Sequence, residues 1–266
     1  MARERSECVS ALSAAMLLLL AGWPGAPAQA EEPASAPKSG TSFLSPDLKA
    51  MQDDDFANPG MLWIGEGEKL WQAKSASGKD CASCHDDAAK SKKGVAARYP
   101  AVDAAEGKPV NLEQRINFCR TRHMGEQPFA YESGDLLSLT AYVAYQSRGL
   151  PMNVETGGAA APFFERGKAL FTMRQGQLNL ACSQCHVDLA GRRLRGDIIS
   201  HGVGVGYPVY RLEWQGLGSL HRRLRSCSFG VRAVQNDYGA DDYVNLELYL
   251  AGRARGLPID TPAIRK

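Results

Sequence analysis

The chain has 266 residues, of which 44% are hydrophobic and 23% are charged. This is the composition of an ordinary globular protein, and it excludes fibrous, collagenous and wholly disordered chains. With 31 basic and 29 acidic side chains, the formal net charge is only +2. So small an excess argues against nucleic-acid binding, and no nucleic-acid partner is expected. The cysteines are too few for a disulfide-stapled scaffold, so their spacing is more informative than their number.

Residues 1–30 have the pattern of a cleaved secretory signal peptide. Arg3 and Arg5 precede an apolar stretch at 11–22, and Ala28 and Ala30 are the small residues expected at a cleavage site. The apolar stretch is too short to cross a bilayer, which requires about 20 residues. Nothing later resembles a membrane span, so we expect a soluble periplasmic protein. Residues 31–60 are expected to form an N-terminal leader rich in Pro, Ser and Asp.

Four of the six remaining cysteines form two C-x-x-C-H motifs, the attachment signature of c-type haem. The motifs are Cys81-Ala82-Ser83-Cys84-His85 and Cys182-Ser183-Gln184-Cys185-His186. The two thiols of each motif form thioethers to the haem vinyl groups, and the adjacent imidazole presents a nitrogen to the iron. A thioredoxin-like cysteine pair or a zinc site is the alternative, but neither explains a histidine directly after both pairs. The cofactors expected are therefore two covalently bound haem c groups.

The sequence around the motifs repeats. An amphipathic helix start at 67–71 recurs at 167–171, and the pattern at 135–151 recurs at 242–258. The apolar spacing in the second pair predicts helices with one buried stripe, closed by Gly and Pro. We therefore expect an all-α fold of two class I cytochrome c-like domains in tandem, each with one covalently bound c-type haem. The domains are 61–152 and 163–266, joined by a linker at 153–162.

The far-side iron ligands are less obvious, because no Met follows Cys185. The candidates within the repeats are Cys119, His123 and Met124 in the first domain, and His201, His221 and Cys227 in the second. The repeat favours the two cysteines, because they keep nearly the same offset as the final helices and end similar segments. A disulfide between them is the alternative. His201 is interpreted as a loop or haem-edge residue.

Basic residues are denser around Cys227 than around Cys119. On a helix, Arg223 shares the face of Cys227, which is four positions later. Positive charge attracts anions and lowers the pKa of a thiol, so we favour a substrate role for Arg223. The alternative is that such arginines cover a haem propionate or lie on a solvated helix face.

Four features together resemble the dihaem SoxA family of the bacterial sulfur-oxidising cytochrome. They are the signal peptide, the two haem motifs, the R-x-x-x-C pattern, and one lone cysteine late in each repeat, Cys119 and Cys227, here called the late cysteines. The resemblance implies that His85 and Cys119 ligate the first iron, and that His186 and Cys227 ligate the second. It further implies that Cys227, found as a persulfide in the family, is the catalytic sulfur beside Arg223. The implied partners are a SoxX-type monohaem cytochrome, the SoxYZ carrier protein and thiosulfate.

The activity implied is that of an L-cysteine S-thiosulfotransferase. Thiosulfate would be conjugated oxidatively to a carrier cysteine, and two electrons would pass through haem to the partner cytochrome. Three alternatives remain open. They are a thiosulfate dehydrogenase that forms tetrathionate, a non-enzymatic dihaem electron-transfer cytochrome, and a dihaem peroxidase with an open coordination position.

Overall fold

A computed structural model describes residues 36–266, which form one compact unit. The expected signal peptide at 1–30 and the start of the leader lie outside the described residues. The leader from residue 36 onward is ordered against the C-terminal strand. The Asn58 side-chain amide donates to the Pro262 carbonyl at 2.9 Å, and Gln52 Oε1 accepts from the Ile264 backbone N–H at 3.1 Å. These buried polar contacts attach the leader to the rest of the protein.

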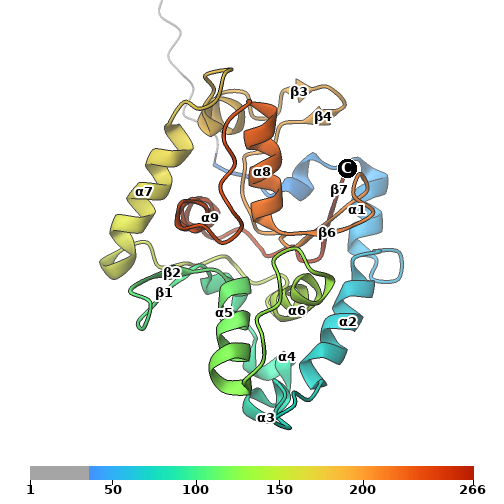
Figure 1. The fold of residues 1–266 in the computed structure, drawn as a ribbon. Helices are drawn as coiled ribbons and strands as arrows, with labels where there is room; N and C mark the ends of the chain where they lie inside the picture. Colours follow the sequence, from blue (N-terminus) through green and yellow to red (C-terminus); the bar gives the residue numbers. More distant parts are fainter. Residues whose placement is uncertain (1–35) are drawn as a thin grey trace, which may run out of the picture. The chain divides into compact units, whose positions relative to one another are not determined.

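Helices and short strands alternate along the described part of the chain (Figure 1). Up to residue 152 the elements are η1 (Gly40–Phe43), α1 (Pro46–Asp53), α2 (Met61–Gln72), α3 (Ala82–His85), α4 (Ala88–Ser91), η2 (Ala96–Arg98), β1 (Ala101–Asp103), β2 (Lys108–Val110), α5 (Leu112–Cys119), η3 (Arg120–Met124) and α6 (Gly134–Tyr145). The remaining elements are η4 (Gly158–Ala160), α7 (Ala161–Thr172), η5 (Gln184–Asp188), β3 (Arg193–Leu194), β4 (Asp197–Ile198), β5 (Val209–Arg211), β6 (Gly216–Gly218), α8 (Leu220–Gly230), α9 (Asp241–Arg253) and β7 (Ala263–Arg265).

The structure contains the internal repeat that the sequence predicts. Helix α2 packs against α6, and α7 packs against α9. Each crossing is so close that a side chain at its glycine would collide with the partner helix: a Cβ at Gly67 would lie 2.2 Å from the Ser138 carbonyl oxygen, and one at Gly167 would lie 2.0 Å from that of Asn245. The two glycines therefore permit backbone contact at equivalent crossings.

The repeat extends to elements that the sequence patterns did not predict. Hairpin β1–β2 recurs in the second half as β5–β6, and each hairpin follows a cis Tyr–Pro bond, Tyr99–Pro100 and Tyr207–Pro208. Each hairpin leads into a capped helix, α5 or α8. The Asn111 side chain accepts from the Gln114 backbone N–H, and the Ser219 side chain accepts from that of Arg222. Such caps satisfy backbone donors at helix starts.

The expectation of an all-α fold describes the helices but omits the strands β1 to β7. These strands are two or three residues long, too short to show an alternating pattern. Strand β5 also pairs in parallel with β7, which makes a three-stranded sheet in the order β6-β5-β7. Helix α7 begins at Ala161, inside the expected linker. The division into domains at 61–152 and 163–266 stays a prediction.

Candidate haem and thiol sites

The first C-x-x-C-H motif forms the short helix α3. The Cys81 carbonyl accepts from the backbone N–H groups of Cys84 and His85, at 3.3 and 3.0 Å. Asp80 precedes the helix and accepts from the Ser83 N–H at 2.6 Å, which holds the pKa of the Asp80 carboxyl below its usual range. The helical turn thus presents both thiols and the imidazole from one short segment.

Cys119 lies at the C-terminal end of α5 and faces this motif. Burial raises the pKa of the Cys81 thiol to about 11, and the proximity of Cys119 adds to the shift. Burial also lowers the pKa of His85, so this imidazole is held neutral, the form that ligates a metal. The structure therefore places Cys119 near Cys81, and the ligation of iron by His85 and Cys119 stays a prediction. Met124, the other sulfur candidate, is buried in the π-helical turn that follows Cys119.

The second motif lies at the start of the π-helical turn η5, where a backbone carbonyl orients its histidine. His186 Nδ1 lies 2.7 Å from the Ser200 carbonyl oxygen. Because a carbonyl can only accept, Nδ1 carries the proton and Nε2 has a free lone pair. Gly202 packs on the same ring: a Cβ at this position would lie 2.7 Å from His186 Cγ. Its φ of +63° also favours glycine.

Cys227 lies on α8 and faces the second motif. Burial raises the pKa of the Cys182 thiol to about 11, and Cys227 is the next contributor to that shift. Burial and Cys227 likewise raise the pKa of the Cys185 thiol. Arg223 lies one helical turn before Cys227 on α8, and the closeness of this sulfur is the main reason that the pKa of Arg223 is raised. The second site thus combines two motif thiols, an oriented imidazole, a third sulfur and a cation.

The six cysteines of residues 36–266 are all unbridged. Cys119 and Cys227 face different motifs, so the structure does not form the disulfide that was the alternative interpretation. The other histidine candidates of the second repeat make different contacts. His221 is fully buried, and its Nδ1 accepts from the Gly239 N–H at 3.0 Å. The backbone carbonyl of His201 accepts a hydrogen bond from Arg253 Nη1 at 3.2 Å. The centroid of the His201 ring lies 5.5 Å from that of the Phe43 ring.

The arginines around the two late cysteines differ in their partners. Near Cys119 every arginine of α5 and η3 has a carboxylate partner: Arg115 pairs with Asp103, Arg120 with Glu126 and Arg122 with Glu106. Near Cys227, Arg222 lies 3.7 Å from Glu132, but Arg223 has no carboxylate within 4 Å in the described part of the chain. Arg225 of α8 also has no carboxylate within this distance in that part of the chain and donates to the Asn236 carbonyl. Of these two cations, Arg223 is the one that shares a helix face with Cys227.

The sequence analysis did not predict three residues of the second site. Tyr207, Arg211 and Arg265 come from the β5–β7 region, and Tyr207 lies close to both Arg223 and Cys227. The signal for the first two was present in the repeat, because Tyr99 and Asp103 stand before Cys119 at the same spacing as Tyr207 and Arg211 before Cys227. Nothing local indicates Arg265, which is brought there by the pairing of β5 with β7.

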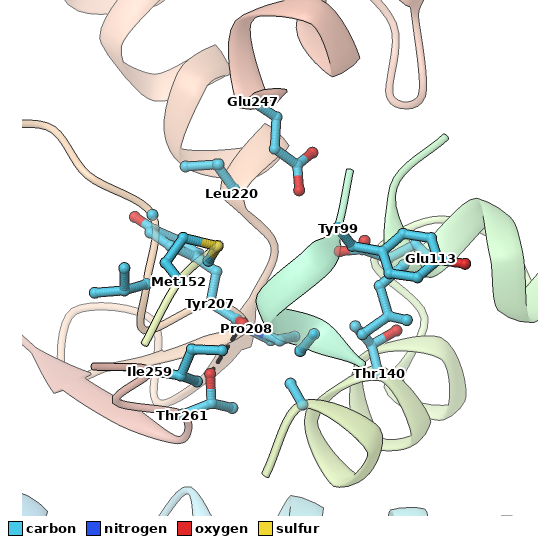
Figure 2. A pocket seen from close by; sticks show the side chains of 15 residues that line it. Tyr99, Glu113, Thr140, Met152, Tyr207, Pro208, Leu220, Glu247, Ile259 and Thr261 are labelled. Atoms are coloured by element: carbon cyan, nitrogen blue, oxygen red, sulfur yellow. Dashed lines mark hydrogen bonds between the residues drawn. The ribbon is translucent and has the colours of Figure 1, made fainter. Parts of the chain in front are cut away.

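A cavity of about 50 Å³ lies between the repeats, away from the motif cysteines. Repeat-equivalent residues line it from both halves, among them Tyr99 with Tyr207 and Thr140 with Glu247 (Figure 2). Figure 2 shows the Glu247 side chain extending from α9 into this space. Glu113 also lines the cavity, and burial raises the pKa of its carboxyl to about 7.

The residues fit haem c at both motifs. Paired thiols precede each imidazole, and at the second motif the Ser200 carbonyl orients His186 so that its Nε2 is free to ligate an iron. A glycine, Gly202, leaves no side chain between the backbone and the His186 ring. The fold and these sites define a c-type cytochrome with covalently bound haem.

Comparisons with known proteins identify the family. Residues 66–152 match the family described as "SoxA/TsdA, cytochrome c domain". The chain is 40% identical over 230 residues to the "L-cysteine S-thiosulfotransferase subunit SoxA" of Pseudaminobacter salicylatoxidans, covering 86% of this chain and 80% of that one. It is 36% identical over 229 residues to the same subunit of Rhodovulum sulfidophilum, with the same coverage. The chain belongs to the SoxA family.

A solved structure agrees with this assignment. The crystal structure of SoxXA from P. pantotrophus matches with a TM-score of 0.83 at 35% identity, covering 86% of this chain and 87% of that one. The names of the relatives confirm the expected enzyme class, L-cysteine S-thiosulfotransferase. Within residues 36–266, no helix is both long and apolar enough to cross a membrane.

Proposed function

We propose that this chain carries two haem c groups and conjugates thiosulfate to a cysteine of a SoxYZ-type carrier at the second motif. The observation that supports this most directly is the pairing of Cys227 with Arg223, a partly buried cation with no carboxylate oxygen within 4 Å among the described residues. His85 and Cys119 would hold the first iron, and His186 and Cys227 the second. Cys81, Cys84, Cys182 and Cys185 would form the thioethers.

The proposed chemistry is oxidative formation of a sulfur–sulfur bond. The Cys227 thiolate and the sulfane sulfur of thiosulfate join to give Cys–S–S–SO₃⁻, with loss of two electrons. The carrier thiolate then attacks the sulfane sulfur, takes the S–SO₃⁻ unit and regenerates the Cys227 thiolate. Haem held at the second motif by Cys182, Cys185 and His186 would supply a one-electron acceptor, and a SoxX-type cytochrome would receive the two electrons. Such a partner is supported by the likeness to the chain crystallised in SoxXA.

Arg223 binds and orients the substrate in this scheme. Thiosulfate is a dianion, and a guanidinium donates paired hydrogen bonds to oxyanions. Because Arg223 shares a helix face with Cys227, it holds the anion beside the attacking sulfur. Partial burial strengthens this attraction, since the local dielectric is lower than that of water.

The test uses the haem-loaded complex with its partner cytochrome, thiosulfate and the carrier. Carrier conjugation is followed by intact mass, and tetrathionate is measured with and without carrier. We expect Cys227→Ser to abolish conjugation while both haems remain attached. Tetrathionate formation without carrier by the wild type, and no conjugate with it, would instead indicate a thiosulfate dehydrogenase.

A matched arginine pair tests the substrate role. Arg115 occupies the same place before Cys119 as Arg223 does before Cys227, but it is paired with Asp103. We expect Arg223→Gln to raise the KM for thiosulfate, and Arg115→Gln to leave it unchanged. Equal effects of the two variants would show that Arg223 acts only through the general charge of the protein.

The compartment is proposed from the signal-peptide pattern of the first thirty residues. We propose export to the periplasm with cleavage near residue 30, where Ala28 and Ala30 stand. Cell fractionation and the N-terminal sequence of the mature protein test this proposal. An uncleaved chain in the cytoplasmic fraction would overturn it.

A further inference from the structure

The two repeats carry the same trio of positions near their late cysteines, with one charge reversed. In the first repeat, Arg115 on α5 donates through Nε to the Tyr99 hydroxyl at 3.1 Å and pairs with Asp103 of β1. A hydrogen bond from the Glu106 N–H, and then the pairing with Arg115, hold the pKa of Asp103 low. This trio is electrically satisfied, because one cation faces one carboxylate.

In the second repeat the equivalent residues are Tyr207, Arg211 and Arg223, which precede Cys227 at the same spacing as the first trio precedes Cys119. Strands β1 and β5 have the same register in their hairpins, so Arg211 occupies the structural place of Asp103. A cation therefore stands where the first repeat has the neutralising carboxylate. After the dominant effect of burial, the charge of Arg223 is the next factor that lowers the pKa of Arg211.

A third arginine joins this pair through the sheet. Strand β7 pairs with β5 so that Arg265 is the register partner of Arg211. Residues in register on neighbouring strands place their side chains on the same face. Tyr207 lies close to the guanidinium groups of Arg211, Arg223 and Arg265, and also to Cys227.

The carboxylates around this cluster do not neutralise its buried side. Glu213 Oε2 lies 3.5 Å from Arg211 Nη2, but the Glu213 side chain is 66% exposed, whereas that of Arg211 is 8% exposed. Asp197 on β4 is exposed, and Asp260 accepts from the Ser39 and Thr41 hydroxyls. Glu213 and Asp197 therefore lie at the exposed side of the cluster, whereas Asp260 is half-buried near Arg265 and is bonded to the two hydroxyl groups.

The donors of the cluster are also incompletely paired. Arg211 Nε is buried with no hydrogen-bond partner among residues 36–266. Arg265 Nη1 donates to uncharged acceptors, Gln52 Oε1 at 3.0 Å and the Ile264 carbonyl at 2.6 Å. A buried guanidinium with an unpaired N–H donor is unfavourable, and a bound oxyanion relieves this cost. The arrangement therefore has the charge and the donors for an anion at the place that Asp103 fills in the first repeat.

We propose that Tyr207 and Arg211, with Arg265 behind them, complete with Arg223 an oxyanion-binding site for the sulfonate end of thiosulfate. This inference rests on the proposed function and extends it. The sulfonate oxygens accept from Arg211 and Arg223, and the sulfane sulfur is directed toward Cys227. A carboxylate such as a haem propionate has the same hydrogen-bonding chemistry, so the test separates the two anions.

The test measures thiosulfate binding by calorimetry on the reduced, haem-loaded complex without carrier, so that neither oxidative bond formation at Cys227 nor transfer to a carrier occurs. We expect Arg211→Gln to raise the Kd for thiosulfate about tenfold or more, because a charged donor to the anion is lost. Arg211→Asp restores the charge arrangement of the first repeat and is expected to abolish binding. The matched control is Arg166→Gln, an exposed arginine on α7 that pairs with Asp242.

Two further readouts decide the identity of the anion. If Arg211 holds a haem propionate, Arg211→Gln shifts the visible spectrum or the reduction potential of the second haem and leaves the Kd for thiosulfate unchanged, which overturns the proposal. Unchanged thiosulfate binding in both Arg211 variants overturns it as well. Arg211→Lys keeps the positive charge at this position. If this variant still binds thiosulfate, the loss of binding in Arg211→Gln is not caused by misfolding. Failure of the wild type to conjugate the carrier would contradict the proposed function. The calorimetric result would still show whether Arg211 contributes to thiosulfate binding.

Discussion

Replacing Glu113 with Gln should stabilise the protein in alkaline conditions and change little in acid. Glu113 is buried on α5, where burial and the neighbouring Glu247 raise its pKa from 4.5 to about 7. His221 opposes the shift, and Glu132 adds to it. His221 Nε2 lies 3.1 Å from Glu247 Oε2, so the imidazole is close to that carboxylate.

The sign follows from proton binding in the two states. Because the folded pKa is the higher one, the folded state binds the Glu113 proton more tightly than the unfolded state does. Its contribution is therefore fully present below pH 4.5 and is lost as the pH rises through 7. At about 1.4 kcal/mol per pKa unit, the loss above pH 7 is roughly 3 kcal/mol. Gln is neutral at every pH, so the Glu113→Gln variant does not suffer this loss of stability.

The assay is urea unfolding of the haem-loaded protein at pH 4.5, 6 and 8, followed by far-ultraviolet circular dichroism. We expect the unfolding free energy of Glu113→Gln to exceed that of the wild type at pH 8 and to match it near pH 4.5. Glu165→Gln, an exposed residue on α7, is the control and should show no such crossover. A constant difference between the Glu113→Gln variant and wild type across this pH range would refute the reasoning.

Two backbone contacts give further predictions. Gly202→Ala places a Cβ against the His186 ring, so we expect an altered electron paramagnetic resonance signal from the second haem; an unchanged signal would contradict the close packing. Gly167→Ala drives α7 away from the Asn245 carbonyl and should cost about 1–3 kcal/mol, measured as a lower Tm. Gly65→Ala on α2 meets open space, so it is the matched control and should not lower the Tm.

The spacing of chemical groups along the chain was the most predictive feature of the sequence. The C-x-x-C-H motifs and the equivalent positions of Cys119 and Cys227 depend on one helical turn and one repeat length, and both are visible without coordinates. The structure places each late cysteine at the motif of its own repeat. The helices α6 and α9 were likewise predictable, because their apolar stripes are long enough to show a period.

Features that depend on pairing between distant segments were not predictable. The place of Arg265 beside Arg211 requires that β7 pairs with β5, and such short strands give no periodic signal for a pairing. The order of the leader depends on Gln52 and Asn58, polar residues that are buried because backbone groups of the C-terminal strand region satisfy them. Composition alone does not determine whether such a segment is ordered.

The charge reversal between the repeats explains how one duplicated scaffold can support two different sites. Arg115 and Arg223 have the same place on equivalent helices, so the arginine by itself does not distinguish them. The residue that does is on the hairpin: Asp103 neutralises the first arginine, whereas Arg211 leaves the second without a carboxylate. A neutralised arginine has little attraction left for a dianion, so the first site lacks the free cation that an anionic substrate requires. By the same argument, the R-x-x-x-C pattern predicts substrate binding only in combination with the hairpin residue, which is Asp103 in the first repeat and Arg211 in the second.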